Sequence, residues 1–506
     1  MKRDHKTFMI ALGLFLSLMV YLTSSAGGGE GSSPVSNAKA ITTFSFTNSA
    51  ATGTISESAK TISVTVPYGT NVTALVVTFT TTGASVKVGL NVQVSGTTPN
   101  DFTNPVAYTV TAADNTTTTY TVSVPVNASA VNVGLFKTGQ IISYDTGSID
   151  DGALQRGVAW PSPRFTTNKD TTVTDNLTGL IWAPNAGTPA FTGATSTCAA
   201  GVTTWQGALD YVACLNANSY LGHTDWRLPN RKELRSLINY GLSNNATWLN
   251  TRGFRNVAPF IYWTSTTYTA RSNMAWYVDI TGAGPVGVSW NLKSFTVFYV
   301  WPVRAGQSNS ADLAFPSSIA KTGLSVSYAT GDDGSLQRGI AWPSPRFTTN
   351  KDTTLTDNLT GLIWAPNAGT PAFTGATSTC AAGGTTWQGA LDYVACLNAN
   401  SYLGYNDWRL PNVNELESLF HAGYTQETCT GSPCATNAAW LSNQGFSNVR
   451  ANEYWSSTTH AASTLTNLPS AWPVDMTDGN MFAQVKTLVN FYVWPVRAGS
   501  HDRRSR

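Results

Sequence analysis

Between residues 38 and 130 the chain alternates apolar and polar positions along short segments. Stretches such as "KTISVTVPYG" and "ALVVTFTTTGASVKV" place β-branched residues at every second position, which is the period of a strand that is buried on one face. Turns rich in Gly, Pro, Asn and Asp separate these stretches. Roughly seven short strands of this kind predict an all-β sandwich over residues 38–130.

A helical period replaces this alternation in the stretch "TTWQGALDYVACLNA". Trp205, Leu209 and Val212 recur at spacings of four and three, as apolar residues do along the buried face of a helix. Thr203 and Gln206 have the spacing of a capping box, in which two side chains satisfy backbone amides at the start of a helix. The sequence therefore predicts a short amphipathic helix that begins after Thr203.

The stretch "DWRLPNRKEL" predicts the end of a strand followed by a second helix. Asn230 can cap this helix while Glu233 reaches back to the cap, and Trp226 and Leu228 alternate inward as they would at a strand end. We interpret Arg227 as a paired, partly buried structural arginine rather than a ligand-binding residue. Most of this stretch is therefore predicted to be scaffolding.

The same features return later, because the second part of the chain is an internal duplication. Residues 152–230 and 334–412 align over 79 positions and differ at six. Both units then continue through "YWTSTT" or "YWSSTT" to "FYVWPVRAG". A unit of this length is too long for a solenoid repeat, so each is expected to have its own core. We call residues 135–306 copy one and residues 320–499 copy two.

The amino terminus has the pattern of a secretory signal. Basic residues precede an apolar run over residues 8–22, and small residues follow it. We predict a signal peptide over residues 1–26 and a Gly/Ser linker over residues 27–37. No other stretch is long and apolar enough for a transmembrane span, so the mature chain is expected to be secreted or held at the bacterial cell surface.

Composition excludes several classes of function. Only 11% of residues are charged, with 30 Lys and Arg against 28 Asp and Glu, so no overall field favours nucleic acid as a partner. The sequence holds no nucleophile elbow, zinc-protease motif or phosphate-binding loop in a suitable context. We therefore predict that the protein is not an enzyme and needs no cofactor, with a glycoside hydrolase as the alternative, which would require two facing carboxylates.

The six cysteines fall into three pairs that are close in sequence. Their spacings do not match zinc sites, and no histidines lie nearby to complete one. In an exported protein such pairs are typical of structural disulfides. The predicted pairs are Cys198 and Cys214, Cys380 and Cys396, and Cys429 and Cys434.

Four motifs of the duplicated unit carry a resemblance to a known family. In order, "TDNLTGLIW", "DWRLPNRKEL", "YWTSTT" and "YVWPVR" resemble the domain of unknown function 1566 (DUF1566), which is also found at the carboxyl end of the Legionella collagen-like adhesin. The resemblance implies an α+β fold similar to C-type lectins and an extracellular recognition role, which in the adhesin is binding to sulfated glycans. The tripeptides with which classical C-type lectins bind sugar through calcium are missing from both copies.

The preceding all-β segment has a resemblance of its own. Its closing stretch, "YTVTAADNTTTTYTVSV", resembles the immunoglobulin-like modules of bacterial surface proteins, which most often act as spacers. The fold expected for the whole chain is therefore multidomain, with an immunoglobulin-like sandwich followed by two C-type-lectin-like α+β domains.

Candidate ligand-binding residues come from basic and aromatic positions beyond the second helix cap. Cationic side chains can pair with sulfate or carboxylate groups, and aromatic rings offer faces to sugar rings. The alternative is that the cations form a solvated helix face and the aromatic residues belong to the core. The candidates are Arg231, Lys232, Arg235, Tyr262, Trp263, Trp276 and Trp290 in copy one and Tyr454, Trp455 and Trp472 in copy two.

A calcium site is a second hypothesis. The run "TTNKDTTVTDNLTG" gathers hard oxygen donors of the kind that Ca²⁺ prefers, although two carboxylates are few for a metal site. The interpretation that we favour is a pair of turns in which Asp and Asn side chains accept hydrogen bonds from the backbone. The candidate ligands are Asp170, Asp175 and Asn176, and Asp352, Asp357 and Asn358.

Together these patterns predict an adhesion or recognition protein whose tandem domains bind extracellular glycans, sulfated ones included, or another surface ligand. Two copies can raise avidity when both reach one target. The alternative is a structural filament or matrix protein that acts through protein–protein contacts and forms homo-oligomers.

Overall fold

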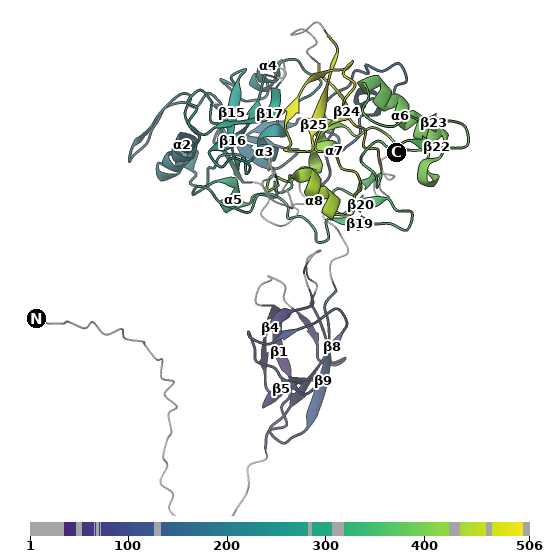
Figure 1. Cartoon of the computed structure of the whole chain (residues 1–506). Coiled ribbons are helices and arrows are strands. Elements are labelled where there is room, and N and C mark those ends of the chain that lie inside the picture. The colour runs from purple at the N-terminus through teal and green to yellow at the C-terminus, as the bar shows by residue number, and fades with distance from the viewer. Residues whose placement is uncertain are drawn as a thin grey trace, which may run out of the picture. The chain divides into compact units, whose positions relative to one another are not determined.

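The computed structural model describes residues 35–46, 53–64, 66, 70, 72–125, 133–281, 286–305, 318–424, 436–461 and 468–498. The chain forms two compact units, one of residues 1–65 and 71–125 and one of residues 66–70 and 126–506 (Figure 1). The predicted signal peptide, most of the predicted linker and the pair Cys429 and Cys434 lie outside the described residues.

The amino-terminal unit is all-β, as its alternating pattern predicted. Its strands form two sheets, with the orders β1-β4-β7 and β2-β3-β9-β8-β5-β6. The inner faces pack through aromatic contacts, such as the edge-to-face pair Phe44 and Tyr108 with ring centroids 5.4 Å apart. The strands are β1 (Ile41–Phe46), β2 (Thr54–Ser56), β3 (Thr61–Ser63), β4 (Leu75–Thr81), β5 (Ser85–Val88), β6 (Asn91–Val92), β7 (Pro99–Asn100), β8 (Val106–Thr111) and β9 (Thr117–Ser123).

Copy one consists of short antiparallel sheets and a few helices. A four-stranded sheet has the order β10-β11-β12-β18, and strands β15, β16 and β17 form the centre of the domain. The elements are α1 (Asp151–Leu154), β10 (Phe165–Thr167), β11 (Val173–Asp175), β12 (Leu180–Trp182), β13 (Phe191–Thr192), β14 (Thr197–Cys198), α2 (Trp205–Ala217), η1 (Tyr220–Gly222), α3 (Arg231–Arg235), α4 (Asn245–Asn250), β15 (Ile261–Thr267), β16 (Met274–Asp279), β17 (Val286–Leu292) and β18 (Val303–Ala305).

Copy two repeats this arrangement. Its sheets have the orders β19-β20-β21-β28, β22-β23 and β24-β25-β27. The elements are α5 (Asp333–Leu336), β19 (Phe347–Thr349), β20 (Leu355–Asp357), β21 (Ile363–Trp364), β22 (Phe373–Thr374), β23 (Thr379–Cys380), α6 (Trp387–Ala399), η2 (Tyr402–Gly404), α7 (Val413–Ser418), α8 (Asn437–Asn443), β24 (Glu453–Thr459), β25 (Ser470–Asp475), β26 (Met481–Phe482), β27 (Gln484–Val485) and β28 (Val496–Arg497).

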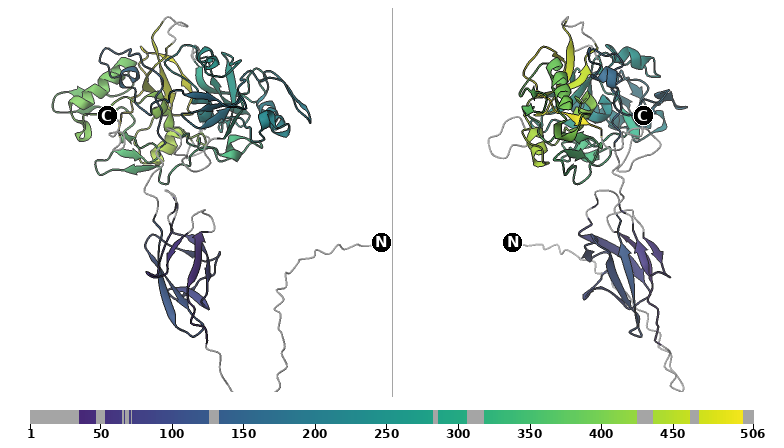
Figure 2. Two further views of the ribbon diagram at one scale, coloured as in Figure 1. Left: turned by 180° about the vertical axis from the view of Figure 1, so that it is seen from behind. Right: turned by 90° about the vertical axis from the view of Figure 1, so that its right-hand side faces the viewer.

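The two copies interlock within the second unit. Strand β26 of copy two pairs with β17 of copy one and extends its sheet. Most of the buried apolar side chains of both copies form one continuous cluster, so the expected separate cores are joined into one. The two copies therefore share backbone pairing as well as a core. Figure 2 shows the copies side by side.

The opening segment of each copy also contacts the other copy. We call residues 133–158 arm one and residues 318–340 arm two. The side-chain amide of Gln140 in arm one donates to the carbonyl of Thr459 at 2.8 Å and accepts from its amide at 3.0 Å. In the opposite direction, Asn230 of copy one donates to the carbonyl of Arg338 in arm two at 3.3 Å. In Figure 1 arm one lies beside the green helix α6, where Gln388 contacts Asp145.

Local features agree with the sequence in most places. The capping boxes of α3 and α7 form between Asn230 and Glu233 and between Asn412 and Glu415. The disulfides Cys198–Cys214 and Cys380–Cys396 are present. The cap of α2 differs, because Thr204, one residue beyond the predicted position, accepts the hydrogen bond from the amide of Gly207.

Candidate functional site

The structure places the three basic candidates of helix α3 inside the contact between the copies. Arg231, Lys232 and Arg235 are buried, with 0%, 8% and 6% of their surfaces exposed. Arg235 pairs with Glu417 of copy two at 3.0 Å, and Arg231 lies 3.6 Å from the same carboxylate. These cations are therefore not exposed, although we had expected them to be, because the second copy covers the helix face that carries them.

Most of the aromatic candidates belong to the core. Tyr262, Trp263 and Trp276 are fully buried, because β15 and β16 lie at the centre of copy one. Tyr454, Trp455 and Trp472 take the corresponding places in copy two and are also buried. Trp290 is partly exposed, but its ring stacks on Tyr268 at 4.7 Å and its N–H donates to Asp478 at 3.2 Å. Burial therefore keeps the other six aromatic candidates from the surface, and Tyr268 covers one face of Trp290.

The calcium candidates of copy one are held by local hydrogen bonds. Asp170 accepts from the amide and hydroxyl of Thr172, and chiefly this hydroxyl lowers the pKa of Asp170 to about 2. Asp175 is buried against Arg164 at 3.3 Å, and Asn176 donates to the carbonyl of Pro163. Asp170 makes the turn contact of the interpretation that we favoured, and so does Asp175, which also accepts from the amide of Leu177. Asn176 instead bonds a residue that is distant in sequence.

Copy two repeats this arrangement. Asp352 accepts from Thr354, Asp357 pairs with Arg346 at 2.7 Å, and Asn358 donates to the carbonyl of Pro345. Among the described residues, no three His, Cys, Asp or Glu side chains gather in a way that would hold a metal ion.

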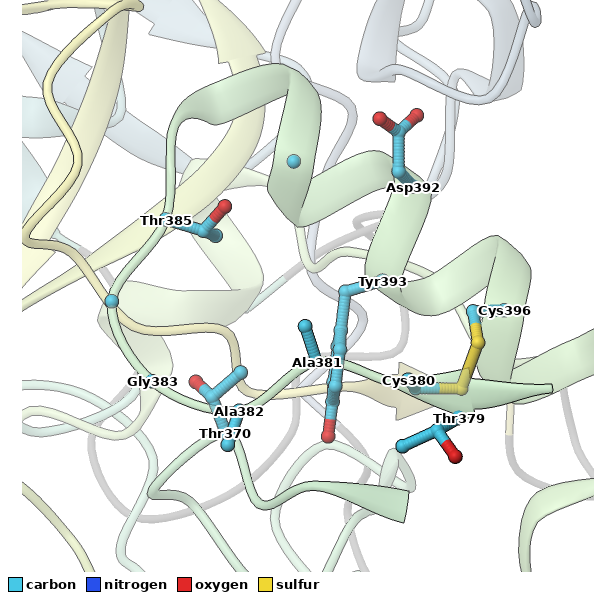
Figure 3. A pocket seen from close by; sticks show the side chains of 12 residues that line it. Thr370, Thr379, Cys380, Ala381, Ala382, Gly383, Thr385, Asp392, Tyr393 and Cys396 are labelled. Carbon is cyan, nitrogen blue, oxygen red and sulfur yellow. A yellow bond between two sulfur atoms is a disulfide. The ribbon is translucent and has the colours of Figure 1, made fainter. Parts of the chain in front are cut away.

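A different surface of copy two is hollowed. A cavity of about 370 Å³ lies between helix α6 and the segment 379–385, and the disulfide Cys380–Cys396 closes one end of it (Figure 3). Tyr393 extends from α6 along Ala381, while the carboxylate of Asp392 points away from that ring. Gly389 lies on the cavity wall, where a Cβ atom would meet the hydroxyl of Thr385 at 2.1 Å. A larger residue there would therefore displace the hydroxyl of Thr385.

A second cavity of about 290 Å³ adjoins the first. Thr370, Ala382 and Gly383 line both, so the two form one groove, which we call the copy-two groove. The far end holds the exposed side chain of Arg450 and the partly exposed ring of Tyr492, whose centroid lies 5.7 Å from the guanidinium carbon. This end also exposes the amide side chain of Asn448, with Asn367 partly exposed beside it.

The groove combines a buried tyrosine with exposed polar side chains. Tyr393 is a buried residue of the groove wall, and its hydroxyl donates to the carbonyl of Pro371 at 2.7 Å. Burial raises the pKa of this hydroxyl. Arg450 supplies several N–H donors, the asparagine amides supply donors and acceptors, and Tyr492 supplies a ring face. Such a mixture of polar groups beside an aromatic face suits a hydroxyl-rich ligand.

Sequence reasoning did not identify this groove. It selected cations by their density along the chain, whereas Arg450 is isolated in sequence. One signal was present, because Gly384 and Val202 are among the six differences between nearly identical stretches, and Gly384 lines the groove.

Comparison with known proteins places these observations in a family. Residues 171–304 and 353–497 both match the Lcl C-terminal domain, and together they make up more than half of the chain. The protein therefore belongs to the Lcl C-terminal domain family, with two copies of that domain. Residues 41–124 match the model described as SGBP, N-terminal. Neither match is to an enzyme family.

Seven chains of solved structures also match, and two of them show how low the similarity is. A Bacteroides fragilis protein described as secreted is 20% identical, with 19% of this chain and 99% of that chain covered and a TM-score of 0.15. A Bacteroides thetaiotaomicron protein described as a glycoside hydrolase is 15% identical, with 56% and 87% covered and a TM-score of 0.16. These scores support no functional argument.

No curated protein matches the sequence significantly. Within the described residues, no helix combines the length and the apolar character that crossing a bilayer requires. The two disulfides agree with a secreted or surface location, because such bonds persist in oxidising compartments.

Proposed function

We propose that this protein is a secreted or surface-associated bacterial protein that binds extracellular glycans through its Lcl C-terminal domains. The observation that carries the proposal is the copy-two groove, which joins Arg450, Tyr492 and two asparagine amides on an accessible surface. The proposed fold of each copy is C-type-lectin-like, and the proposed role of the amino-terminal sandwich is that of an immunoglobulin-like spacer.

The family matches support this proposal. SGBP denotes a surface glycan-binding protein, and the amino-terminal unit matches the first domain of that family. The Lcl C-terminal domain is adhesin-like, and two copies follow in one chain. A glycan ligand agrees with the groove, because sugar hydroxyls exchange hydrogen bonds with amides and guanidinium groups while the ring face packs on an aromatic side chain.

The experiment is a glycan array probed with the fluorescently labelled full chain. The array includes neutral and sulfated polysaccharides, and the salt concentration is varied, since contacts with charged sugars weaken as salt rises. We expect saturable binding that free oligosaccharide displaces. Tyr492→Ala should weaken this binding, whereas Tyr144→Ala, which changes an exposed tyrosine outside the groove, should not.

Absence of binding to every glycan would overturn the proposal. Binding that Tyr492→Ala leaves unchanged would place the glycan elsewhere on the chain. A variant that has lost binding is informative only when its intrinsic tryptophan emission matches that of the unchanged protein.

A further inference from the structure

The residues of the copy-two groove recur in copy one with two exceptions. Gly384 corresponds to Val202, and Arg450 corresponds to Ala258. Every other residue that lines either of the two cavities is identical in the two copies. The backbone confirms the second correspondence. The amides of Ala258 and Arg450 each donate to the hydroxyl of a core tyrosine, Tyr262 or Tyr454, at 2.8 Å.

The change from Arg450 to Ala258 removes the only cationic side chain among the residues that line the groove. Arg450 is exposed, lines the cavity and forms no ion pair within the described part of the chain. Its guanidinium group is therefore available to a ligand beside the ring of Tyr492. Ala258 in copy one offers neither a charge nor a hydrogen-bond donor, although Tyr299 repeats the ring.

The change from Gly384 to Val202 alters the shape of the groove wall. At Gly384 a Cβ atom would lie 2.9 Å from the carbonyl oxygen of Val489 and from the carbonyl carbon of Asn490. Any side chain there would force this segment away from the groove, because real Cβ atoms do not approach backbone so closely. In copy one Val202 occupies this position and is 42% exposed, so it presents an apolar surface instead.

We propose that glycan binding is confined to copy two, so that each chain holds one site, with Arg450 and Gly384 as the residues that distinguish it from copy one. This inference rests on the proposed function. Among the residues that line the groove only these two differ, and through them copy one lacks the guanidinium group and gains an apolar side chain. Copy one then serves as a structural partner, since it covers α7 and supplies arm one to copy two.

Isothermal titration of the full chain with an oligosaccharide selected on the array tests this inference. We expect one ligand per chain. Arg450→Ala should weaken binding by about tenfold or more, as expected when a charged hydrogen-bond donor is lost. Arg450 is exposed, so this change should leave the fold intact, and an unchanged thermal unfolding curve monitored by tryptophan emission serves as the control.

A reciprocal variant sharpens the test. Combining Val202→Gly with Ala258→Arg gives copy one the groove residues of copy two and should raise the stoichiometry to two ligands per chain. The inference is overturned if the unchanged protein binds two ligands, if Arg450→Ala binds as tightly as the unchanged protein, or if the reciprocal variant still binds one. Absence of any binding by the unchanged protein would overturn the proposed function together with this inference.

Discussion

Arg235 and Glu417 occupy equivalent positions in the two copies and bind each other across the contact between them, with 3.0 Å separating a guanidinium nitrogen from a carboxylate oxygen. Each lies five residues beyond the asparagine that caps its helix, α3 or α7. If both copies had the same charged residue at this position, two like charges would face each other. The difference between the copies instead makes the contact complementary in charge.

Reversing one charge of this pair should destabilise the tandem domains. Glu417→Arg would leave Arg231, Lys232 and Arg235 buried without their shared carboxylate, and losing one partner of a buried pair costs about 3–5 kcal/mol. The exchange Arg235→Glu combined with Glu417→Arg should recover part of that loss. All 17 tryptophans lie between residues 160 and 494, so denaturant unfolding followed by tryptophan emission reports on these domains alone.

A matched control is the exposed pair of Arg304 and Asp225, which has a separation of 2.7 Å. Its disruption by Asp225→Ala should cost no more than about 1 kcal/mol, because water screens exposed pairs. Equal losses for Asp225→Ala and Glu417→Arg would contradict the structural role of the buried pair.

The buried carboxyl group of Asp333 predicts a stability that depends on pH. It accepts hydrogen bonds from Thr322 at 2.6 Å and from Thr266 of the other copy at 2.8 Å. Burial, which outweighs these bonds, raises its pKa to about 7, above the value near 3.9 of an unfolded chain. Between these values the folded state holds the extra proton, so the contribution of Asp333 to stability is fully present at about pH 4 and is lost as pH rises through 7.

Asp333→Asn removes this titration while keeping an oxygen that accepts both hydroxyls. The free energy of unfolding of the variant, relative to that of the unchanged protein, should therefore increase from pH 4 to pH 7 and then level off. Denaturant unfolding at a series of pH values measures this difference. Curves that run parallel across the range would show that Asp333 does not change its protonation between the two states.

The two disulfides allow stability to be separated from binding. Each closes a loop with a sequence separation of 16, and opening such a loop costs about 3 kcal/mol in the chain-entropy model. Replacing Cys380 and Cys396 by serine should destabilise copy two and weaken glycan binding, because both residues line the groove. The same replacement of Cys198 and Cys214 should cost similar stability but leave binding intact. Equal loss of binding in both variants would count against the groove as the site.

Gln140 should be important for the attachment of arm one. Its buried side chain bonds both backbone groups of Thr459, in the way that a neighbouring strand would. Gln140→Ala leaves the buried peptide groups of Thr459 without these partners, at a cost of about 1–3 kcal/mol each. Copy two has Leu324 at the equivalent position, so Leu324→Ala is a control that removes apolar packing alone. Arm release should appear as faster amide hydrogen exchange at Thr459 in the glutamine variant only.

Features encoded over short distances could be predicted from the sequence. They are the alternating strands of the first unit, the capping boxes of α3 and α7 and the first two disulfides, which all depend on residues that are close along the chain. The duplication was also visible, because it is a likeness between two stretches of the sequence itself. Arg227 was likewise recognised as structural, and it pairs with Glu233 only six residues away, at 2.6 Å. In each case the partner lies within the same stretch, so spacing alone identifies the interaction.

Only the tertiary structure decided which basic and aromatic residues reach solvent. Arg231 and Arg235 resemble an exposed helix face until Glu417, about 180 residues later, is brought against them. The copy-two groove likewise joins segments near residues 370, 382, 450 and 492, none of which is distinctive alone. The physical reason is that burial and concavity arise from packing between distant segments, whereas helix caps, strand alternation and short disulfide loops are set by neighbours in the chain.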